Sequence, residues 1–306
     1  IGTDKEGKPV HVPAGKWWLG HEQRRQYETV VFAPGQETPN AYNLWKGYNF
    51  EARPGDRHQM YLDHLYEVIC GGVKEYYDYL VQWMARTVQQ PDSPGQVAIV
   101  LRGGQGTGKG TLAKHFSALF GRHALQVSDP KHLVGSFNSH LQDCVVLFGD
   151  EAFYAGDKKH ESVLRSLITE DTLTVERKGV DADVTPNYIH LILASNSNWI
   201  VPAGADERRF LVLDVGDEYK QNSAHFQQMQ EQMNNGGYAS LLHYFQTMDL
   251  SEFDVRAVPK TAALREQKLL SLSPEEEWWY KKLTEGRVLE RQDTWEKEIP
   301  KKDLVD

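Results

Sequence analysis

The sequence predicts an α/β fold in which helices flank a five-stranded parallel sheet. Four short apolar runs and one weaker run are separated by stretches of helical character. A glycine-rich loop follows the first run, and a hairpin pattern precedes the fourth. Near-continuous apolar strands that alternate with helices are typical of a parallel sheet covered on both faces. The predicted strands are 97–101, 124–127, 144–148, 189–194 and 210–215.

Three regions are expected along the 306 residues. Residues 1–95 begin with short strands and turns, become helical from about 59, with a break at Gly71-Gly72, and end in the linker "QPDSPG". Residues 96–216 form the α/β core, and residues 217–306 form a helical region that could begin a winged-helix segment near its end. Ser273, followed by Pro274 and acidic residues, predicts a helix start.

Composition limits the class of protein. Hydrophobic residues make up 40% and charged residues 25%, which is typical of a globular chain. No apolar run is long enough to span a membrane, and the two cysteines cannot form a zinc cage or a disulfide framework. These features predict a cytoplasmic protein without a membrane partner. The net charge of −9 restricts any nucleic-acid contact to a few local cations.

The stretch "GGQGTGKGTL" predicts a phosphate-binding loop. Gly103, Gly108 and Lys109 have the required spacing, and the loop lies between a strand and a helix. Glycines let backbone N–H groups approach phosphates, and the following helix adds positive charge at its start. A glycine-rich turn with an incidental lysine is the simpler interpretation, which the order strand, loop, helix disfavours. The predicted ATP-binding residues are Gly103, Gly104, Gln105, Gly106, Thr107, Gly108, Lys109, Gly110 and Thr111.

One position departs from the usual pattern. Gly110 stands where a Ser or Thr hydroxyl normally binds Mg²⁺, and the hydroxyl comes one residue later, at Thr111. Thr111 could bind the metal, it could contact another phosphate, or an extra water could replace the missing ligand. The sequence leaves these alternatives open.

Polar residues end two other apolar runs. Asp150 and Glu151 follow "VVLFG", and Asn196 follows "LILAS". Ligands bind beyond the carboxyl ends of such strands. Asp150 is therefore expected to hold Mg²⁺, Glu151 to polarise the attacking water, and Asn196 to orient that water or to contact the γ-phosphate. An exposed acidic turn and an ordinary Asn at a strand end are the competing interpretations.

Two further stretches carry cations. Arg208 and Arg209 in "ADERRF" could reach a neighbouring subunit's nucleotide, or they could form a surface pair with nearby acids. The stretch "LTVERKGVDADVTP" predicts a β-hairpin with Arg177 and Lys178 near its tip. These cations could bind DNA phosphates, although a plain solvated hairpin remains an alternative.

Together these motifs resemble the superfamily 3 helicases, an AAA+ group of viral, phage and plasmid replication motors. The ordered set is the loop, "VVLFGDEA", "LRSLITEDTLTVERKG", "LILASNSN" and "ERRF". The chain looks most similar to the helicase part of phage and prophage primase-helicases, relatives of the poxvirus-type enzyme. The flanks "YNLWKGYNF", "YLVQWMARTVQQP" and "PKTAALREQKLLSLSPEEEWW" extend the resemblance over most of the chain.

The resemblance implies an AAA+ core that assembles as a hexameric ring with ATP between subunits. Lys109, Asp150, Glu151 and Asn196 would come from one subunit and an arginine, by preference Arg208, from the next. The hairpin would carry single-stranded DNA through the channel, with movement 3′ to 5′. A primase-polymerase domain would precede the helicase in a longer protein, and the setting would be the bacterial host cell.

Three other functions compete with the helicase interpretation. The spelling "GKGT" also occurs in adenylate-kinase-like enzymes, but these do not need the later motifs in this order. An AAA+ ATPase could instead remodel protein or move duplex DNA without unwinding it, and the ATP site alone does not distinguish this function. A binding module with a decayed ATPase is disfavoured because Lys109, Asp150 and Glu151 are all present.

Overall fold

The computed structural model covers the whole chain and describes residues 2–3, 5–129, 135, 138–151, 158–177, 179–204, 207–288, 295 and 298. The chain divides into two compact units, Ile1–Lys46 and Gly47–Asp306. The first unit contains two small strand pairs and one short helix. Its elements are β1 (Gly2–Thr3), β2 (Pro9–Val10), α1 (Ala14–Leu19), β3 (Thr29–Val31) and β4 (Ala41–Asn43).

The side chain of Asn43 links the strand pair β3–β4 to the loop that follows β3. The Asn43 side chain accepts a hydrogen bond from Ala33 N at 3.1 Å and donates one to Ala33 O at 2.8 Å. Short strands and turns agree with the expectation from the sequence. The six-residue helix α1 was not predicted, because its stretch carries no apolar face that becomes buried.

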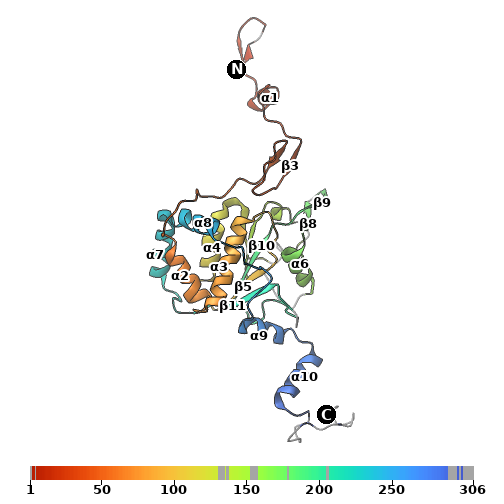
Figure 1. Cartoon of the computed structure of the whole chain (residues 1–306). Coiled ribbons are helices and arrows are strands. Elements are labelled where there is room, and N and C mark those ends of the chain that lie inside the picture. Colours follow the sequence, from red (N-terminus) through yellow and green to blue (C-terminus); the bar gives the residue numbers. More distant parts are fainter. Residues whose placement is uncertain are drawn as a thin grey trace. The chain divides into compact units, whose positions relative to one another are not determined.

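The second unit is built around the five-stranded sheet that the sequence predicts (Figure 1). All neighbouring strands are parallel, and their order is β11-β5-β10-β7-β6. The strands are β5 (Ala98–Arg102), β6 (Ala124–Val127), β7 (Val146–Asp150), β10 (His190–Ser195) and β11 (Phe210–Asp214). The first strand of the core therefore lies between the last two, so the direction in which strands are added reverses beside β5.

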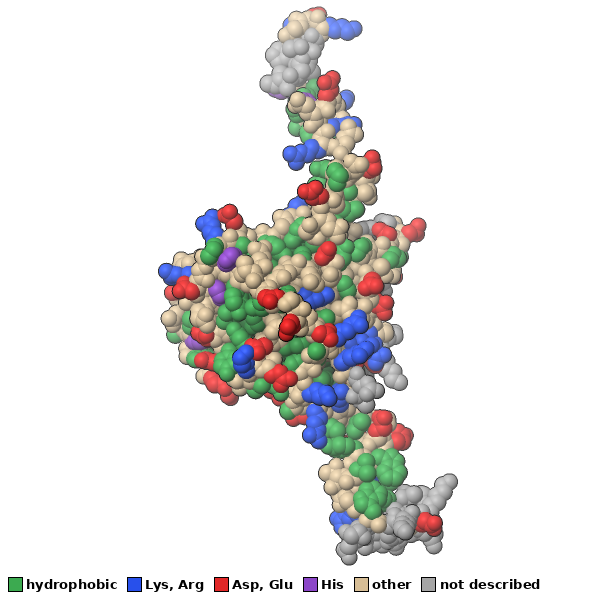
Figure 2. All heavy atoms as spheres, viewed as in Figure 1, with side chains coloured by type: hydrophobic (Ala, Val, Ile, Leu, Met, Phe, Trp, Pro, Cys, Tyr) green, Lys and Arg blue, Asp and Glu red, His purple; other side chains and the backbone are tan. Residues whose placement is uncertain are grey.

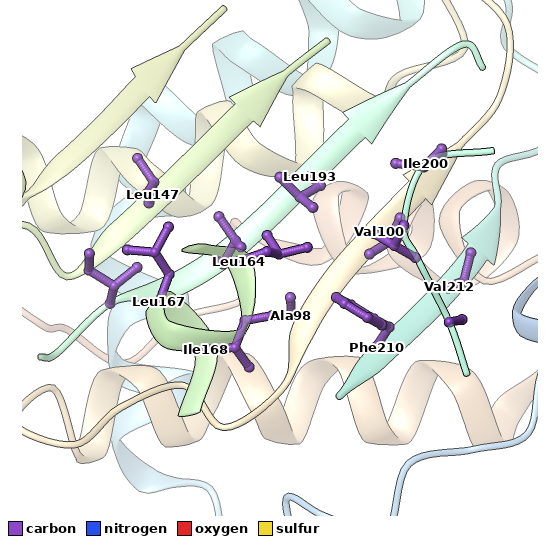
Figure 3. Packing of buried hydrophobic residues seen from close by; sticks show 14 of the residues in the cluster. Ala98, Val100, Leu147, Leu164, Leu167, Ile168, Leu193, Ile200, Phe210 and Val212 are labelled. Atoms are coloured by element: carbon purple, nitrogen blue, oxygen red, sulfur yellow. The ribbon is translucent and has the colours of Figure 1, made fainter. Parts of the chain in front are cut away.

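Helices cover both faces of the sheet, and the strands accordingly carry apolar residues on both faces. Helix α6 (Lys158–Thr169) packs Leu164, Leu167 and Ile168 against one face, where Ala98, Val100 and Leu193 are fully or almost fully buried (Figure 3). Residues on the opposite face alternate with these along each strand, as the two-residue period of a strand requires. Burying such a face is the main favourable contribution to stability.

Three helices pack together in the unit, and aromatic rings join them. They are α3 (Lys74–Gln89), α4 (Lys109–Phe120) and α8 (Tyr238–Thr247). Phe116 of α4 contacts Trp83 of α3 and Phe245 of α8, with ring centroids 6.2 and 6.0 Å apart. Helix α4 also contacts β6, β7 and β10. Because α4 starts directly after the glycine-rich loop, this packing fixes the position of the loop.

The hairpin expected before β10 is formed by β8 (Thr172–Arg177) and β9 (Val180–Pro186), which pair antiparallel. A bulge interrupts the register between Val175 and Arg177. Leu173 and Val175 are buried, whereas the neighbouring residues of β8 alternate outward. One face of the hairpin therefore packs on the unit and the other is exposed.

Helical segments flank the sheet at both ends of the unit. Before the sheet lie α2 (Gln59–His64), the π-helical turn η1 (Leu65–Ile69) and α3, and after it come α7 (Ser223–Gln232), η4 (Met233–Gly237), α8, α9 (Ala262–Leu270) and α10 (Pro274–Glu285). The short 3₁₀ turns η2 (Gly121–His123) and η3 (Ser139–Leu141) lie within the core. Ser273 begins α10 with the reciprocal capping box that Glu276 completes, as its sequence predicts.

Local sequence signals predict which elements are present more accurately than where each one begins and ends. The strands begin or end within two residues of the predicted positions, and Gly71-Gly72 does separate η1 from α3. Within the predicted helical region 217–306, the helix is interrupted at Gly236, whose φ of +100° only glycine adopts easily. Within the described residues, no helix has the length and apolar character needed to cross a bilayer.

Candidate phosphate-binding site

The glycine-rich loop lies at the carboxyl edge of the sheet, between β5 and α4. This is the point at which the strand order reverses, where open α/β sheets bind their ligands. A cavity of about 630 Å³ opens here. It is lined by Gln105, Gly106, Thr107, Gly108, Lys109, Gly110, Thr111, Lys114, Asp150, Glu151, Asn196, Gln221, Ser223 and Phe226. The fold therefore brings together residues from four separate parts of the chain.

Two glycines in the loop are required by its geometry. Gly106 and Gly108 have φ values of +78° and +98°, and Gly108 caps the start of α4. A Cβ atom at Gly108 would lie 2.5 Å from Cε1 of His64, so no side chain fits there. The Thr107 hydroxyl donates to the carbonyl oxygen of Gly104 at 3.0 Å, which closes the turn.

His64 supports the loop from inside the protein. Its side chain is buried, and its Nε2 lies 3.3 Å from the carbonyl oxygen of Gly108, so Nε2 carries the proton that is donated. Burial lowers the pKa of His64 to about 4. The imidazole is therefore neutral at pH 7, and it adds no charge beneath the loop.

Lys109, the first residue of α4, points back across the loop. Its Nζ donates to the carbonyl oxygens of Gly103 at 2.5 Å and Gly104 at 2.7 Å, and to Oδ1 of Asn196 at 2.8 Å. Burial lowers the pKa of the Lys109 ammonium, and the charges of Glu151 and Asp150 oppose this shift. The Lys109 ammonium group thus donates hydrogen bonds to three uncharged oxygens. Phosphate oxygens could replace these as acceptors.

Asp150 and Glu151 lie at the end of β7, as the sequence predicts. Asp150 accepts a hydrogen bond from Nε2 of Gln126 at 3.3 Å and is half-buried. Glu151 has a φ of +56°, which is unusual for a residue with a side chain. Its backbone N–H donates to the carbonyl oxygen of Ala194 at 2.9 Å, so the pairing with β10 continues into this residue.

The end of β10 contributes both a hydroxyl and an amide. The Ser195 hydroxyl donates to Oε2 of Glu151 at 2.6 Å, and the Asn196 backbone N–H donates to Oε1 at 2.8 Å. The Asn196 side chain accepts from Lys109. The sequence identified Asn196 but assigned no function to Ser195. The signal that could have indicated Ser195 is its position beside Asn196 at the end of a strand.

Gly110 faces open space. A Cβ atom at this position would meet no heavy atom within 4 Å, so sterics do not exclude Ser or Thr here. Thr111 lines the same cavity as Asp150 and Glu151. Within the described residues, no three His, Cys, Asp or Glu side chains are grouped to hold a metal ion by themselves. Mg²⁺ commonly uses one or two carboxylates together with phosphate oxygens and water, and this set of donors fits that pattern.

Gly103 and Gly104 face a second, adjoining cavity of about 570 Å³ that also includes Asn196. Arg102 forms ion pairs there with Asp214 at 2.5 Å and Glu266 at 2.6 Å, which link β5 to β11 and α9. Gly103 and Gly104 therefore do not line the first cavity. Among the nine residues expected to bind ATP, these two affect it only through their carbonyl oxygens, which accept hydrogen bonds from Lys109.

The sequence did not predict the wall formed by α7 and the turn before it. Gln221, Ser223 and Phe226 line the cavity, and Gln221 N donates to the carbonyl oxygen of Gly106 at 3.2 Å. A Cβ atom on Gly104 would lie 3.4 Å from Nζ of Lys220. No local motif marks these residues, because only the tertiary fold brings the chain after β11 back to the loop.

The two arginines before β11 have different surroundings. Arg209 forms an ion pair with Glu207 at 3.1 Å, and the Glu207 carboxylate, which is 4% exposed, also accepts from the backbone N–H groups of Arg208 and Arg209. The Arg208 side chain is exposed and makes no ion pair with any residue that the structure describes. Asp206 lies outside the described residues.

The hairpin cations are placed only in part. Arg177 ends β8, where its backbone pairs with Val180, and Lys178 lies outside the described residues. Acidic and basic side chains are interspersed over the face seen in Figure 2, without a continuous basic surface. This mixture agrees with the net charge of −9.

Residues 101–209 match a family of unknown function (DUF5906). This range contains the glycine-rich loop and the ends of β7 and β10. Over 167 residues the chain is 28% identical to the DNA primase-polymerase of Nitratiruptor phage NrS-1. The match covers 53% of this chain but 23% of the phage protein. The chain thus corresponds to less than a quarter of that relative's length.

Solved structures of the NrS-1 C-terminal region have a similar fold. One apo structure aligns with a TM-score of 0.69 and 21% identity, covering 83% of this chain and 63% of that one. The A form apo structure aligns with a TM-score of 0.67 and 20% identity, covering 80% and 60%. At this level of identity the likeness establishes a shared fold.

Proposed function

We propose that the chain is the ATP-hydrolysing motor of a phage or mobile-element replication helicase. One observation carries the proposal: most of the predicted loop, from Gln105 to Thr111, surrounds one cavity together with Asp150, Glu151 and Asn196, although these residues follow three different strands. Lys109, Asn196 and Glu151 are linked there through the end of β10. A chance glycine turn would not bring a buried lysine and two carboxylates to one cavity.

Each residue has a function that its surroundings permit. The loop N–H groups and the start of α4 would bind the β- and γ-phosphates, and Lys109 would exchange its carbonyl and amide partners for phosphate oxygens. Asp150 and Thr111 would hold Mg²⁺, which neutralises phosphate charge in such sites. Glu151 would accept a hydrogen bond from the attacking water and direct it toward the γ-phosphate, with Asn196 close to that phosphate.

The comparisons support a function in DNA replication. The NrS-1 relative is a DNA primase-polymerase, and the shared fold lies in its C-terminal region. An upstream primase-polymerase domain in the full-length protein, acting in the cytoplasm of a bacterial host, is part of this proposal.

Ring assembly completes the proposal. The exposed Arg208 side chain would reach the nucleotide of the adjacent subunit, and six hairpins would contact single-stranded DNA in the channel, moving along it 3′ to 5′. Repetition of a few cations around a ring would produce a phosphate-binding surface that one acidic chain lacks. This explains how a chain of net charge −9 could bind DNA.

Phosphate release from ATP tests the proposal. We expect hydrolysis that needs Mg²⁺, is abolished by EDTA, rises with single-stranded DNA and is lost in Lys109→Ala. Hydrolysis that DNA leaves unchanged would favour an ATPase that remodels protein or moves duplex DNA. Transfer of phosphate to a nucleoside monophosphate would instead support the kinase alternative. Absence of hydrolysis with and without DNA would refute the proposal.

A further inference from the structure

Both oxygens of the Glu151 carboxylate are bound by the end of β10. Oε2 accepts from the Ser195 hydroxyl at 2.6 Å, and Oε1 accepts from the Asn196 N–H at 2.8 Å. Ser195 is 3% exposed, so bulk water does not compete for its hydroxyl. Hydrogen bonds to an ionised carboxylate are shorter and stronger than those between neutral groups.

The surroundings of Ser195 determine the direction of its hydroxyl. Its Oγ accepts a hydrogen bond from the backbone N–H of Ser197 at 3.1 Å. A hydroxyl has one hydrogen to donate, and this hydrogen is directed to Glu151. The backbone of Ser195 is equally fixed, because its carbonyl oxygen accepts from Gly103 N at 3.2 Å at the start of the glycine-rich loop.

Glu151 requires such support because its own backbone is in the left-handed region, with a φ of +56°. Residues with side chains adopt this conformation at a cost and keep it where neighbouring groups determine it. The residue is exposed overall, so its side chain could otherwise take several rotamers. The two bonds from β10 select one of them.

We propose that Ser195 is a positioning residue for Glu151. It fixes the carboxylate toward the cavity so that Glu151 can orient the attacking water, and this inference rests on the proposed ATP hydrolysis. The adjacent Asn196 side chain binds Lys109, so consecutive residues of one strand end contact the phosphate-binding cation and the hydrolytic carboxylate. Nucleotide binding would replace the Lys109–Asn196 contact and leave the Ser195–Glu151 contact in place.

The test separates hydrolysis from binding. Ser195→Ala is expected to lower kcat about 10- to 100-fold, the range seen when an orienting partner is removed from a metal site, with KM for ATP unchanged. Ser195→Thr, which keeps a hydroxyl, is expected to restore kcat. Ser197→Ala is the matched control: its hydroxyl bonds to the carbonyl oxygen of Trp199, outside the cavity, and kcat should stay at the wild-type value.

A double-mutant cycle excludes a purely structural explanation. If Ser195 acts through Glu151, Ser195→Ala should cause no further loss in a Glu151→Gln background. Melting temperatures are measured for every variant. If Ser195→Ala does not fold, Ser195→Cys preserves the side-chain size with a weak thiol donor, and the same loss of kcat is expected.

Three results would overturn the inference while leaving ATP hydrolysis intact. These are a normal kcat in a folded Ser195→Ala, a raised KM with unchanged kcat, and an equal loss in the Glu151→Gln background. A wild-type chain that does not hydrolyse ATP would instead refute the proposed function, and the inference would fail with it.

Discussion

The cavity at the edge of the sheet and the hairpin β8–β9 are both expected to act on phosphates, but the structure supports them to different extents. At the cavity, Asn196 bonds to two of the other predicted residues: its side-chain oxygen accepts from Lys109, and its backbone N–H donates to Glu151. The hairpin has one packed face, formed by Leu173 and Val175, and its strand register is interrupted between Val175 and Arg177.

The cavity and the hairpin illustrate two kinds of functional site: one that is formed within a single chain and one that would need several copies of the chain. The arrangement of the cavity depends on the topology of one sheet, so under the proposed function a single chain would supply all the groups except an arginine from a neighbouring subunit. DNA binding by the hairpin would depend on repetition around a ring. Three predictions test this contrast, beginning with the largest expected effect.

The two arginines before β11 should have separate functions. Arg208→Ala is expected to lower the rate of hydrolysis by about 10³- to 10⁵-fold, as loss of an arginine finger does elsewhere. Arg209→Ala should instead lower the free energy of unfolding by about 1 kcal/mol, because its partly exposed ion pair with Glu207 is lost. Steady-state phosphate release and denaturant unfolding measure these effects.

Mixed assemblies provide the control for Arg208. Subunits with Arg208→Ala and subunits with Lys109→Ala, combined in varied ratios with wild-type subunits, should inhibit the assembly more strongly than simple dilution. Activity that falls in proportion to the wild-type fraction would contradict a site shared between subunits.

Two glycines of the loop should respond in opposite directions. Gly108→Ala places a Cβ atom against His64 at a φ of +98°, so we expect a loss of about 1–3 kcal/mol in the free energy of unfolding and weaker ATP binding. Gly110→Ala is the matched substitution two residues later. Its Cβ atom meets nothing within 4 Å, and the helix should become up to about 1 kcal/mol more stable. Equal stability changes would show that the loop differs from this geometry.

The hairpin should produce the smallest and most selective effect. Arg177→Ala combined with Lys178→Ala is expected to weaken binding of single-stranded DNA and leave hydrolysis without DNA unchanged. The dependence of log affinity on log salt should fall by about 1.4 per contacting subunit, since each neutralised phosphate contributes about 0.7 on single strands.

Asp181→Asn and Asp183→Asn form the control on the same hairpin. They remove negative charge, so DNA binding should strengthen slightly. A double cation variant with wild-type DNA affinity would refute the assignment of the hairpin to DNA.

The sequence predicted the sheet because its signals are local. The apolar runs identify the strands, and the glycines, Asp150, Glu151 and Asn196 occupy strand ends that a parallel sheet places at one edge. His64, Ser195 and Phe226 were not assigned functions, since each acts through a contact between segments distant in sequence. Such contacts leave no periodicity or spacing to recognise.

The separate surroundings of Arg208 and Arg209 were equally hidden. The letters "ERRF" contain two similar cations, and only the burial of Glu207 distinguishes their partners. Which arginine forms an ion pair depends on which carboxylate is buried in the folded chain. Burial of a carboxylate is set by the tertiary structure.

The most direct test of the central claim is to measure ATP binding and hydrolysis side by side in Glu151→Gln. The account predicts wild-type affinity for ATP, because Lys109 and the loop are intact, together with a loss of phosphate release of at least about 100-fold, the lower range for a general base. Hydrolysis at the wild-type rate by Glu151→Gln would contradict the assignment of this cavity as the site of the reaction.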